Sequence, residues 1–171
     1  TARDAYHADS TASELASDLV RSVREGYPFD GDEAGWLACE LLQDFVLPGQ
    51  RDLLYLVLCT LVKNALLALR SALPDDPRVY IVLGAAAPAP GLPEQPVIRV
   101  SDNGPGIVPE VLQRLTHEPV TTRADAGGSG MGLVFCRRVM GSLGGTVDVR
   151  SMPGQGAAVT LYFPPVEEAR A

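Results

Sequence analysis

Apolar residues recur along the chain with two different spacings, which separate predicted helices from predicted strands. From Ser13 onward an apolar residue returns about every fourth position, which predicts a short helix that stops at Gly26 and Pro28. Residues 52–72 carry a continuous apolar stripe and predict the strongest helix, which must pack against a sheet. A third helix is predicted for residues 131–143.

Strand-forming residues occupy the segments between these helices. Strands are expected at 78–83, 96–101, 145–151 and 157–163, with one or two edge strands within 36–46. The stretch 84–95, dominated by Ala, Pro and Gly, predicts a mobile hairpin loop, and 104–130 predicts a functional lid with a short helix at 109–115. The predicted fold class is an α/β (α+β) two-layer sandwich, with a mixed, mostly antiparallel sheet covered on one face by about three helices.

Length and composition favour one globular domain. The 171 residues, 46% of them hydrophobic, suit a single domain over 13–165, with a disordered or linker N-terminus at 1–12 and a C-terminal tail at 166–171. The net charge of -7 argues against a nucleic-acid partner. The apolar run 53–62 is shorter than a membrane span of roughly 20 residues, and no signal peptide precedes it, so no direct membrane insertion is expected. Three widely spaced cysteines in apolar stretches predict reduced core thiols in a cytoplasmic protein.

Two polar positions interrupt the longest predicted helix. Asn64 lies at the margin of the apolar stripe, one turn after Thr60, and Lys63 beside it is the only lysine in the chain. An asparagine here either bonds a neighbouring loop or offers Mg²⁺ the hard oxygen ligand that the ion prefers. The residues alone leave both alternatives open.

Two glycine-rich segments have the chemistry of a nucleotide site. Residues 102–107 (Asp-Asn-Gly-Pro-Gly-Ile) follow a predicted strand, so Asp102 can accept a hydrogen bond from an exocyclic amine where the glycines let the backbone approach a ligand. Residues 127–133 (Gly-Gly-Ser-Gly-Met-Gly-Leu) lead into a helix whose N-terminal amides favour phosphate. Other known motifs are excluded. The chain has no Gly-Lys dipeptide, so it lacks a P-loop, and its glycine spacing does not match the dinucleotide motif GxGxxG. Met131 stands where the hydrolase motif GxSxG requires glycine. A fourth segment, 154–164, has the pattern of a turn and a strand.

These four segments, in this order, resemble the N, G1, G2 and G3 boxes of the GHKL ATPase superfamily, and specifically the catalytic domain of bacterial sensor histidine kinases. The likeness spans about 13–165 and implies the Bergerat fold, with Mg²⁺ and ATP as cofactors. It implies that Asn64 binds the metal, Asp102 binds adenine and Lys63 lies near the phosphates. The segments at 27–29, 63–66 and 135–140 are similar to the quorum-sensing branch of hybrid kinases. The full set of nucleotide-binding residues implied by the resemblance is Asp102, Gly104, Gly106, Ile107, Thr122, Arg123, Gly128, Gly130, Met131, Gly132 and Leu133, with Asn64 and Lys63 as the catalytic pair.

The chain departs from the family pattern at three places. Thr60 replaces a second asparagine, Ala157 replaces a hydroxyl residue near adenine, and 117–123 is a shortened F box without phenylalanines. Neither His7 nor His117 lies in a phosphoacceptor motif, so the resemblance implies a histidine on a separate dimerisation domain of the same kinase, followed by a response regulator or receiver domain. We expect the domain to be monomeric in isolation and to be the cytoplasmic portion of a membrane-bound sensor.

Three rival functions are considered. A hydrolytic GHKL ATPase would usually carry a general-base glutamate upstream of the asparagine, and 57–62 contains no acid. A serine kinase of the anti-sigma type shares the boxes and differs in its acceptor. A degenerate, non-catalytic nucleotide-binding or regulatory module is the alternative to which the three departures point.

Overall fold

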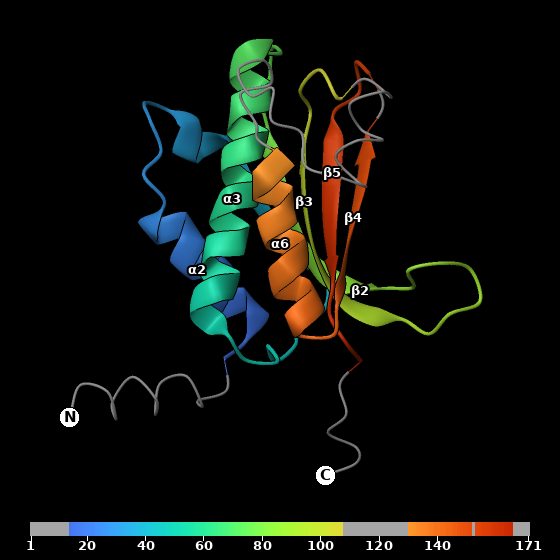
Figure 1. Cartoon of the computed structure of the whole chain (residues 1–171). Coiled ribbons are helices and arrows are strands. Elements are labelled where there is room, and N and C mark those ends of the chain that lie inside the picture. The colour runs from blue at the N-terminus through green and yellow to red at the C-terminus, as the bar shows by residue number, and fades with distance from the viewer. Residues whose placement is uncertain (1–13, 108–129, 152, 166–171) are drawn as a thin grey trace, which may run out of the picture.

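A five-stranded sheet with helices on one face forms the core of the protein (Figure 1). The computed structural model describes residues 14–107, 130–151 and 153–165. In chain order its elements are α2 (Ala16–Gly26), the 3-10 helix η1 (Glu33–Trp36), β1 (Leu37–Leu41), α3 (Arg51–Ser71), β2 (Val79–Ala86), β3 (Gln95–Asp102), α6 (Gly130–Ser142), β4 (Thr146–Ser151) and β5 (Ala157–Tyr162). The predicted mixed two-layer sandwich is confirmed.

Strand order in the sheet is β1-β2-β3-β5-β4, so the last strand of the chain lies inside the sheet. Among the described strands, only the β1-β2 pair is parallel, because α3 lies between them in the chain and returns it to the end of the sheet where β1 began. The other three pairs are antiparallel, and the β4-β5 pair is the hairpin expected from the sequence. β1 and β4 are the two edge strands.

Helix α3 lies centrally against the sheet, between α2 and α6 (Figure 1). Its buried side chains follow the predicted apolar stripe and pack on the inner faces of β2 and β3: Leu54, Val57, Leu58, Leu61, Val62, Ala65, Leu66 and Leu69. By length and composition, α3 is the one helix of the described chain that could cross a membrane. Its packing against the sheet accounts for that composition as the stripe of a core helix.

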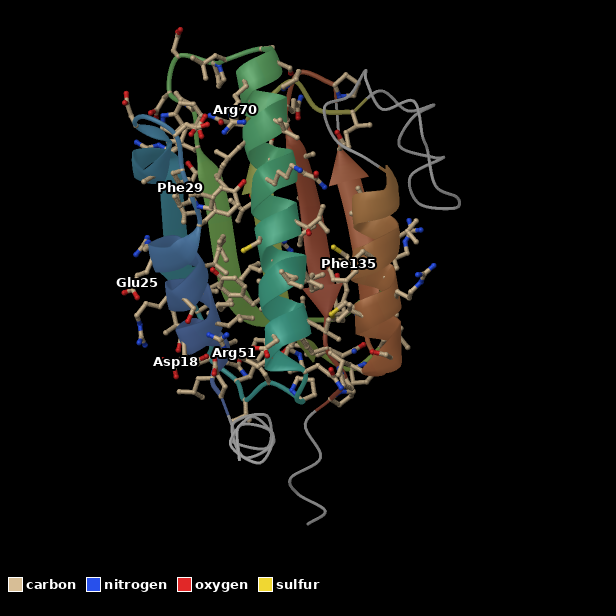
Figure 2. All side chains as sticks on the ribbon, turned by 60° about the vertical axis from the view of Figure 1, so that its left-hand side comes forward. Asp18, Glu25, Phe29, Arg51, Arg70 and Phe135 are labelled. Atoms are coloured by element: carbon tan, nitrogen blue, oxygen red, sulfur yellow. The ribbon has the colours of Figure 1, made fainter. Side chains whose placement is uncertain are left out.

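Figure 2 shows Arg51 and Arg70 near opposite ends of α3, and charged contacts of both residues attach the helix to the N-terminal part of the fold. At its start, Arg51 Nε donates to Glu14 Oε2 at 3.0 Å and Arg51 Nη2 to Ser22 Oγ at 2.9 Å. At its end, Arg70 Nε and Nη2 each lie 2.6 Å from a carboxylate oxygen of Glu33. The paired, hydrogen-bonded Glu33 is only 7% exposed, and the Arg70 bonds hold the pKa of its carboxyl below the usual range.

Three details differ from the sequence predictions. The hairpin loop is shorter than 84–95, because β2 continues to Ala86 and β3 begins at Gln95. η1 was not predicted. Of the three cysteines, Cys136 is buried and Cys59 half-buried, but Cys39 is exposed because it lies on an edge strand; the prediction of three core thiols is wrong for Cys39. The helix expected at 109–115 lies outside the described residues.

Candidate functional site

Thr60 and Asn64, two polar residues on α3, face the start of α6. Gly132 is so close that a Cβ placed on it would lie 3.1 Å from Thr60 Cγ2 and 3.8 Å from Asn64 Nδ2. Because glycine has no side chain, the N-terminal turn of α6 can approach this part of α3. The predicted metal ligand and the predicted phosphate cradle are therefore neighbours.

The Asn64 amide is half-buried. Within 14–107, 130–151 and 153–165, its side chain makes no hydrogen bond. Thr60, one turn earlier, instead donates its hydroxyl to Leu56 O at 2.8 Å, within its own helix. The alternative that Asn64 serves to bond a neighbouring loop thus finds no partner in the described structure.

Asp102 ends β3 beside the same stretch of α3. The bridge is Gly104, where an added Cβ would lie 2.9 Å from Asp102 Oδ1 and 3.5 Å from Ala68 Cβ. Ala68 is one turn after Asn64, a rise of about 6 Å along the helix. Asp102 and Asn64 therefore lie on the same side of the molecule, joined through Gly104 and one turn of α3.

Burial sets the electrostatics of Asp102. Desolvation raises the pKa of its carboxyl, and backbone N–H groups of Gly104 and Ala157 oppose part of that rise. The Gly104 N–H donates to Asp102 Oδ1 at 2.8 Å. A carboxylate has about four acceptor positions, so capacity remains for a donor on a ligand.

The C-terminal hairpin holds the turn after Asp102 in place. Gly154 N donates to Pro105 O at 2.6 Å, and Ile107 N donates to Ser151 Oγ at 2.6 Å. Gly156 completes the contact: with φ of 91°, it lies so near that an added Cβ would be 2.0 Å from Asp102 O. The hairpin therefore supports the site although it contributes none of the predicted ligand-binding side chains.

Asn103, next to Asp102, has a structural task. Its Oδ1 accepts from Arg78 N at 2.8 Å, and its Nδ2 donates to Asp76 O at 2.7 Å. Both amide groups are thus occupied by the loop that precedes β2. Asn103 therefore uses its amide to hold the fold together, whereas the chemically identical amide of Asn64 makes no hydrogen bond within the described residues.

The remaining predicted site residues fall into four groups. Lys63 is exposed beside Asn64, Gly106 has φ of 80° in the turn, and Ile107 is half-buried there. Leu133 is 4% exposed in the core, so only its backbone could serve a ligand. Gly130 and Met131 open α6. Thr122, Arg123 and Gly128 lie outside the described residues.

Sequence reasoning missed two supporting residues, Ser151 and Ala68. Ser151 ends a predicted strand, and its hydroxyl also donates to Gly156 O at 3.1 Å, which no local pattern indicates. Ala68 belonged to the apolar stripe, where its small size could have indicated a close approach of another segment.

Comparison with known proteins identifies the family. Residues 49–167 match the model of the HATPase_c family, described as histidine kinase-, DNA gyrase B- and HSP90-like ATPase. The chain belongs to this family. This family membership confirms the predicted GHKL resemblance and the prediction of an ATP-binding domain.

Several curated relatives of this HATPase_c domain are named as sensor kinases. It is 44% identical to the CAI-1 autoinducer sensor kinase/phosphatase CqsS of Vibrio cholerae over 71 residues, 42% of this chain and 10% of that protein. It is 30% identical to sporulation kinase D of Bacillus subtilis over 122 residues, 71% of this chain and 22% of that protein. It is also 30% identical to the autoinducer 1 sensor kinase/phosphatase LuxN of Vibrio campbellii over 126 residues, 74% of this chain and 14% of that protein. The predicted likeness to histidine kinases, including kinases that sense autoinducers, is confirmed, and the chain spans about a tenth to a fifth of these relatives.

Solved structures agree on the fold. The catalytic domain of histidine kinase ThkA, in a nucleotide-free form, superposes with a TM-score of 0.64 at 19% identity. The match covers 90% of this chain and 96% of that one. The HATPase_c domain therefore has the fold of a histidine kinase catalytic domain.

Proposed function

We propose that this chain binds Mg-ATP and is the catalytic domain that supplies the γ-phosphoryl group to a histidine on a separate dimerisation domain of the same kinase. The observation that carries the proposal is the convergence of Asn64, Asp102 and the start of α6. Family membership and the sensor-kinase relatives support it. The phosphoryl group would pass onward to a response regulator or receiver domain.

Each part of the site has a chemical task in this proposal. Asp102 accepts a hydrogen bond from the adenine amine, and Gly104 and Gly106 keep the backbone clear of the base. Backbone N–H groups at the start of α6 face the phosphates, aided by the helix dipole. Lys63 adds a positive charge nearby.

The donor set fits a magnesium ion. Asn64 presents a half-buried amide oxygen with no protein partner in the described chain, which is the type of hard ligand that Mg²⁺ accepts beside phosphates and water. Asn64 would hold the ion. When bound, Mg²⁺ neutralises charge on the phosphates.

Positioning, rather than a nucleophile of this domain, carries the reaction. Phosphoryl transfer depends mainly on alignment and charge stabilisation, so the acceptor histidine can come from elsewhere in the kinase. We propose that the domain is monomeric alone and lies in the cytoplasmic portion of a membrane-bound sensor. Alone it should bind ATP and turn it over slowly.

Titration calorimetry with ATP, in Mg²⁺ and in EDTA, tests the metal site. Asn64→Ala should weaken binding in Mg²⁺ by about 10- to 100-fold and have little effect in EDTA. Asn103→Ala is the matched control: it removes the same side chain from a structural position, so stability falls while the Mg²⁺ dependence of binding stays. If wild type binds no ATP, or if both variants lose the same affinity, the proposal fails.

Transfer to histidine needs a second experiment. The chain is mixed with the dimerisation domain of its kinase and γ-labelled ATP. Acid-labile, base-stable label on that domain is expected. Acid-stable label would indicate a serine kinase, and ATP binding without transfer would indicate a binding module.

A further inference from the structure

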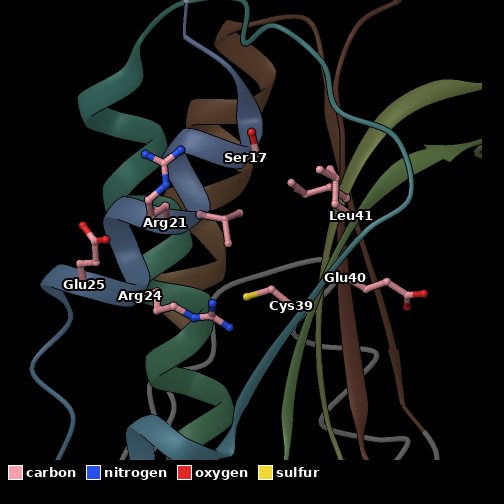
Figure 3. A pocket seen from close by; sticks show the side chains of 9 residues that line it. Ser17, Arg21, Arg24, Glu25, Cys39, Glu40 and Leu41 are labelled. Atoms are coloured by element: carbon pink, nitrogen blue, oxygen red, sulfur yellow. The ribbon is translucent and has the colours of Figure 1, made fainter.

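A groove of about 400 Å³ separates α2 from the edge strand β1 (Figure 3). We call it the α2–β1 groove. Its lining includes Ser17, Val20 and Arg24 on α2, Cys39 and Leu41 on β1, and Leu83 on β2. Arg21 and the carboxyl residues Glu25 and Glu40 complete the lining. It shares no lining residue with the nucleotide site, which lies between α3, α6 and the end of β3.

The β1 side of the groove has backbone groups available for pairing. Leu42 N donates to Leu83 O at 2.8 Å, so by alternation Ala38 and Glu40 also direct their backbone toward β2. Cys39 and Leu41 therefore direct their N–H and C=O groups to the outer edge. Both residues are exposed, Leu41 by 55%, and no other described strand pairs with this edge.

The α2 side supplies a positive charge. Figure 3 shows Arg24 reaching from α2 toward Cys39, whereas Glu25 points away from the strand. Arg21, one turn earlier, is paired with Asp18, but no carboxylate of the described residues pairs with Arg24. Desolvation raises the pKa of the Cys39 thiol, and the nearby charge of Arg24 opposes part of that rise.

We infer that the α2–β1 groove binds an extended peptide segment that adds to β1 as a sixth strand and carries a carboxylate for Arg24 two residues from an apolar side chain for Leu41. Side chains two apart in a strand point to the same face, so both would meet the α2 side of the groove. Addition of a strand beside an exposed edge, with side-chain pockets giving specificity, is a recurrent mode of peptide recognition. This is a protein-interaction function beyond ATP binding.

A second copy of the chain fits the groove less well. Paired edge to edge, its β1 would present Leu37, Cys39 and Leu41 on this face, and its carboxylate Glu40 on the other. The charge of Arg24 would stay unmatched. Repulsion between two chains of net charge -7 opposes the same contact.

NMR titration of the ¹⁵N-labelled chain tests the inference. The probes are acetylated Ser-Thr-Asp-Thr-Leu-Thr-Ser and its reversed sequence, which cover both strand directions, with Lys in place of Asp as the control peptides. One acidic probe should shift the amide signals of Cys39 and Leu41 saturably, with a dissociation constant of about 1 mM or below. The matching Lys peptide should bind about fivefold more weakly.

Protein variants separate groove binding from general charge. Arg24→Glu should weaken the acidic peptide about fivefold and strengthen the Lys peptide, while Arg138→Glu, the same change on the exposed face of α6, should leave both unchanged. Cys39→Pro removes an outward N–H without breaking the β1–β2 pairing and should abolish binding. ATP binding by each variant reports that its fold is intact.

Three outcomes would overturn the inference. The Cys39 and Leu41 signals do not respond to either acidic peptide; or Arg24→Glu, with ATP binding retained, does not change peptide affinity. In the third, the same signals shift when the protein alone is concentrated, which assigns the edge to self-association.

Discussion

Replacing Asp102 by asparagine should separate the stability of the fold from its recognition of adenine. The two side chains have nearly the same shape, and an asparagine Oδ1 can still accept the Gly104 N–H that now lies 2.8 Å from the carboxylate. The negative charge is lost. The substitution also removes one of the two carboxylate oxygens that could accept a hydrogen bond from a ligand amine.

The free energy of unfolding of Asp102→Asn should exceed that of wild type, as the pH dependence of the Asp102 carboxyl indicates. The pKa of Asp102 is raised from 3.8 because burial disfavours the ion more than the backbone hydrogen bonds favour it. Above that raised pKa, wild type therefore bears the cost of a partly desolvated charge, and the cost disappears as pH falls through the raised pKa. Asp102→Asn should have a higher free energy of unfolding than wild type at pH 7 to 8, and the difference should shrink toward acid pH.

Affinity should change in the opposite direction. A hydrogen bond to a charged group contributes about 1.5–3 kcal/mol, so loss of the proposed adenine contact should weaken ATP binding about 10- to 150-fold. Inosine triphosphate has an oxygen where adenine has its amine, so wild type should bind it more weakly than ATP by the same factor. The variant should discriminate little between the two nucleotides.

Calorimetry with both nucleotides, and urea unfolding between pH 4 and 8, measure these effects. The reasoning is refuted if wild type binds inosine triphosphate as tightly as ATP. It is also refuted if Asp102→Asn keeps wild-type ATP affinity. A variant less stable than wild type at pH 8 would show that the buried charge is not the dominant electrostatic cost.

Other positions give further predictions. Glu33→Gln should lower the free energy of unfolding by about 1–2 kcal/mol at pH 7, because it weakens the ion pair at the end of α3; since the folded pKa of Glu33 lies below 4.5, urea unfolding should show this difference vanish as pH falls through that folded value. Gly156→Ala, whose Cβ would meet Asp102 O, should cost about 2–5 kcal/mol, whereas Gly154→Ala, with open space around it, should cost only about 1 kcal/mol in thermal unfolding. In mass-spectrometric alkylation, exposed Cys39 should react before the buried α6 cysteine, whose pKa is raised to about 12; equal rates would contradict the burial difference.

The sequence predicted those features that depend on local periodicity. The α3 stripe and the β4-β5 hairpin each arise from residues close together in the chain, and both were located to within a few residues. β2 extended further than expected because Gly84, Ala85 and Ala86 have little strand propensity of their own. Pairing with β3 makes them a strand.

The candidate site was predictable in its residue types and not in its supports. Asp102 and the glycines belong to short motifs, so their positions could be inferred from the sequence. The hydroxyl of Ser151 and the close approach of Gly156 to Asp102 depend on which strand neighbours β3, which the residues alone do not determine. Exposure of Cys39 likewise depends on β1 being an edge.

The position of β5 has a consequence for synthesis on the ribosome. This strand emerges after the other four strands of the described sheet, yet it must enter between β3 and β4, and its preceding turn supports the Asp102 loop. Until residues 157–162 leave the exit tunnel, β3 and β4 each keep unpaired the edge that β5 covers in the finished sheet, which is a hazard for aggregation. Nucleotide capture should therefore begin only when nearly the whole domain has been translated.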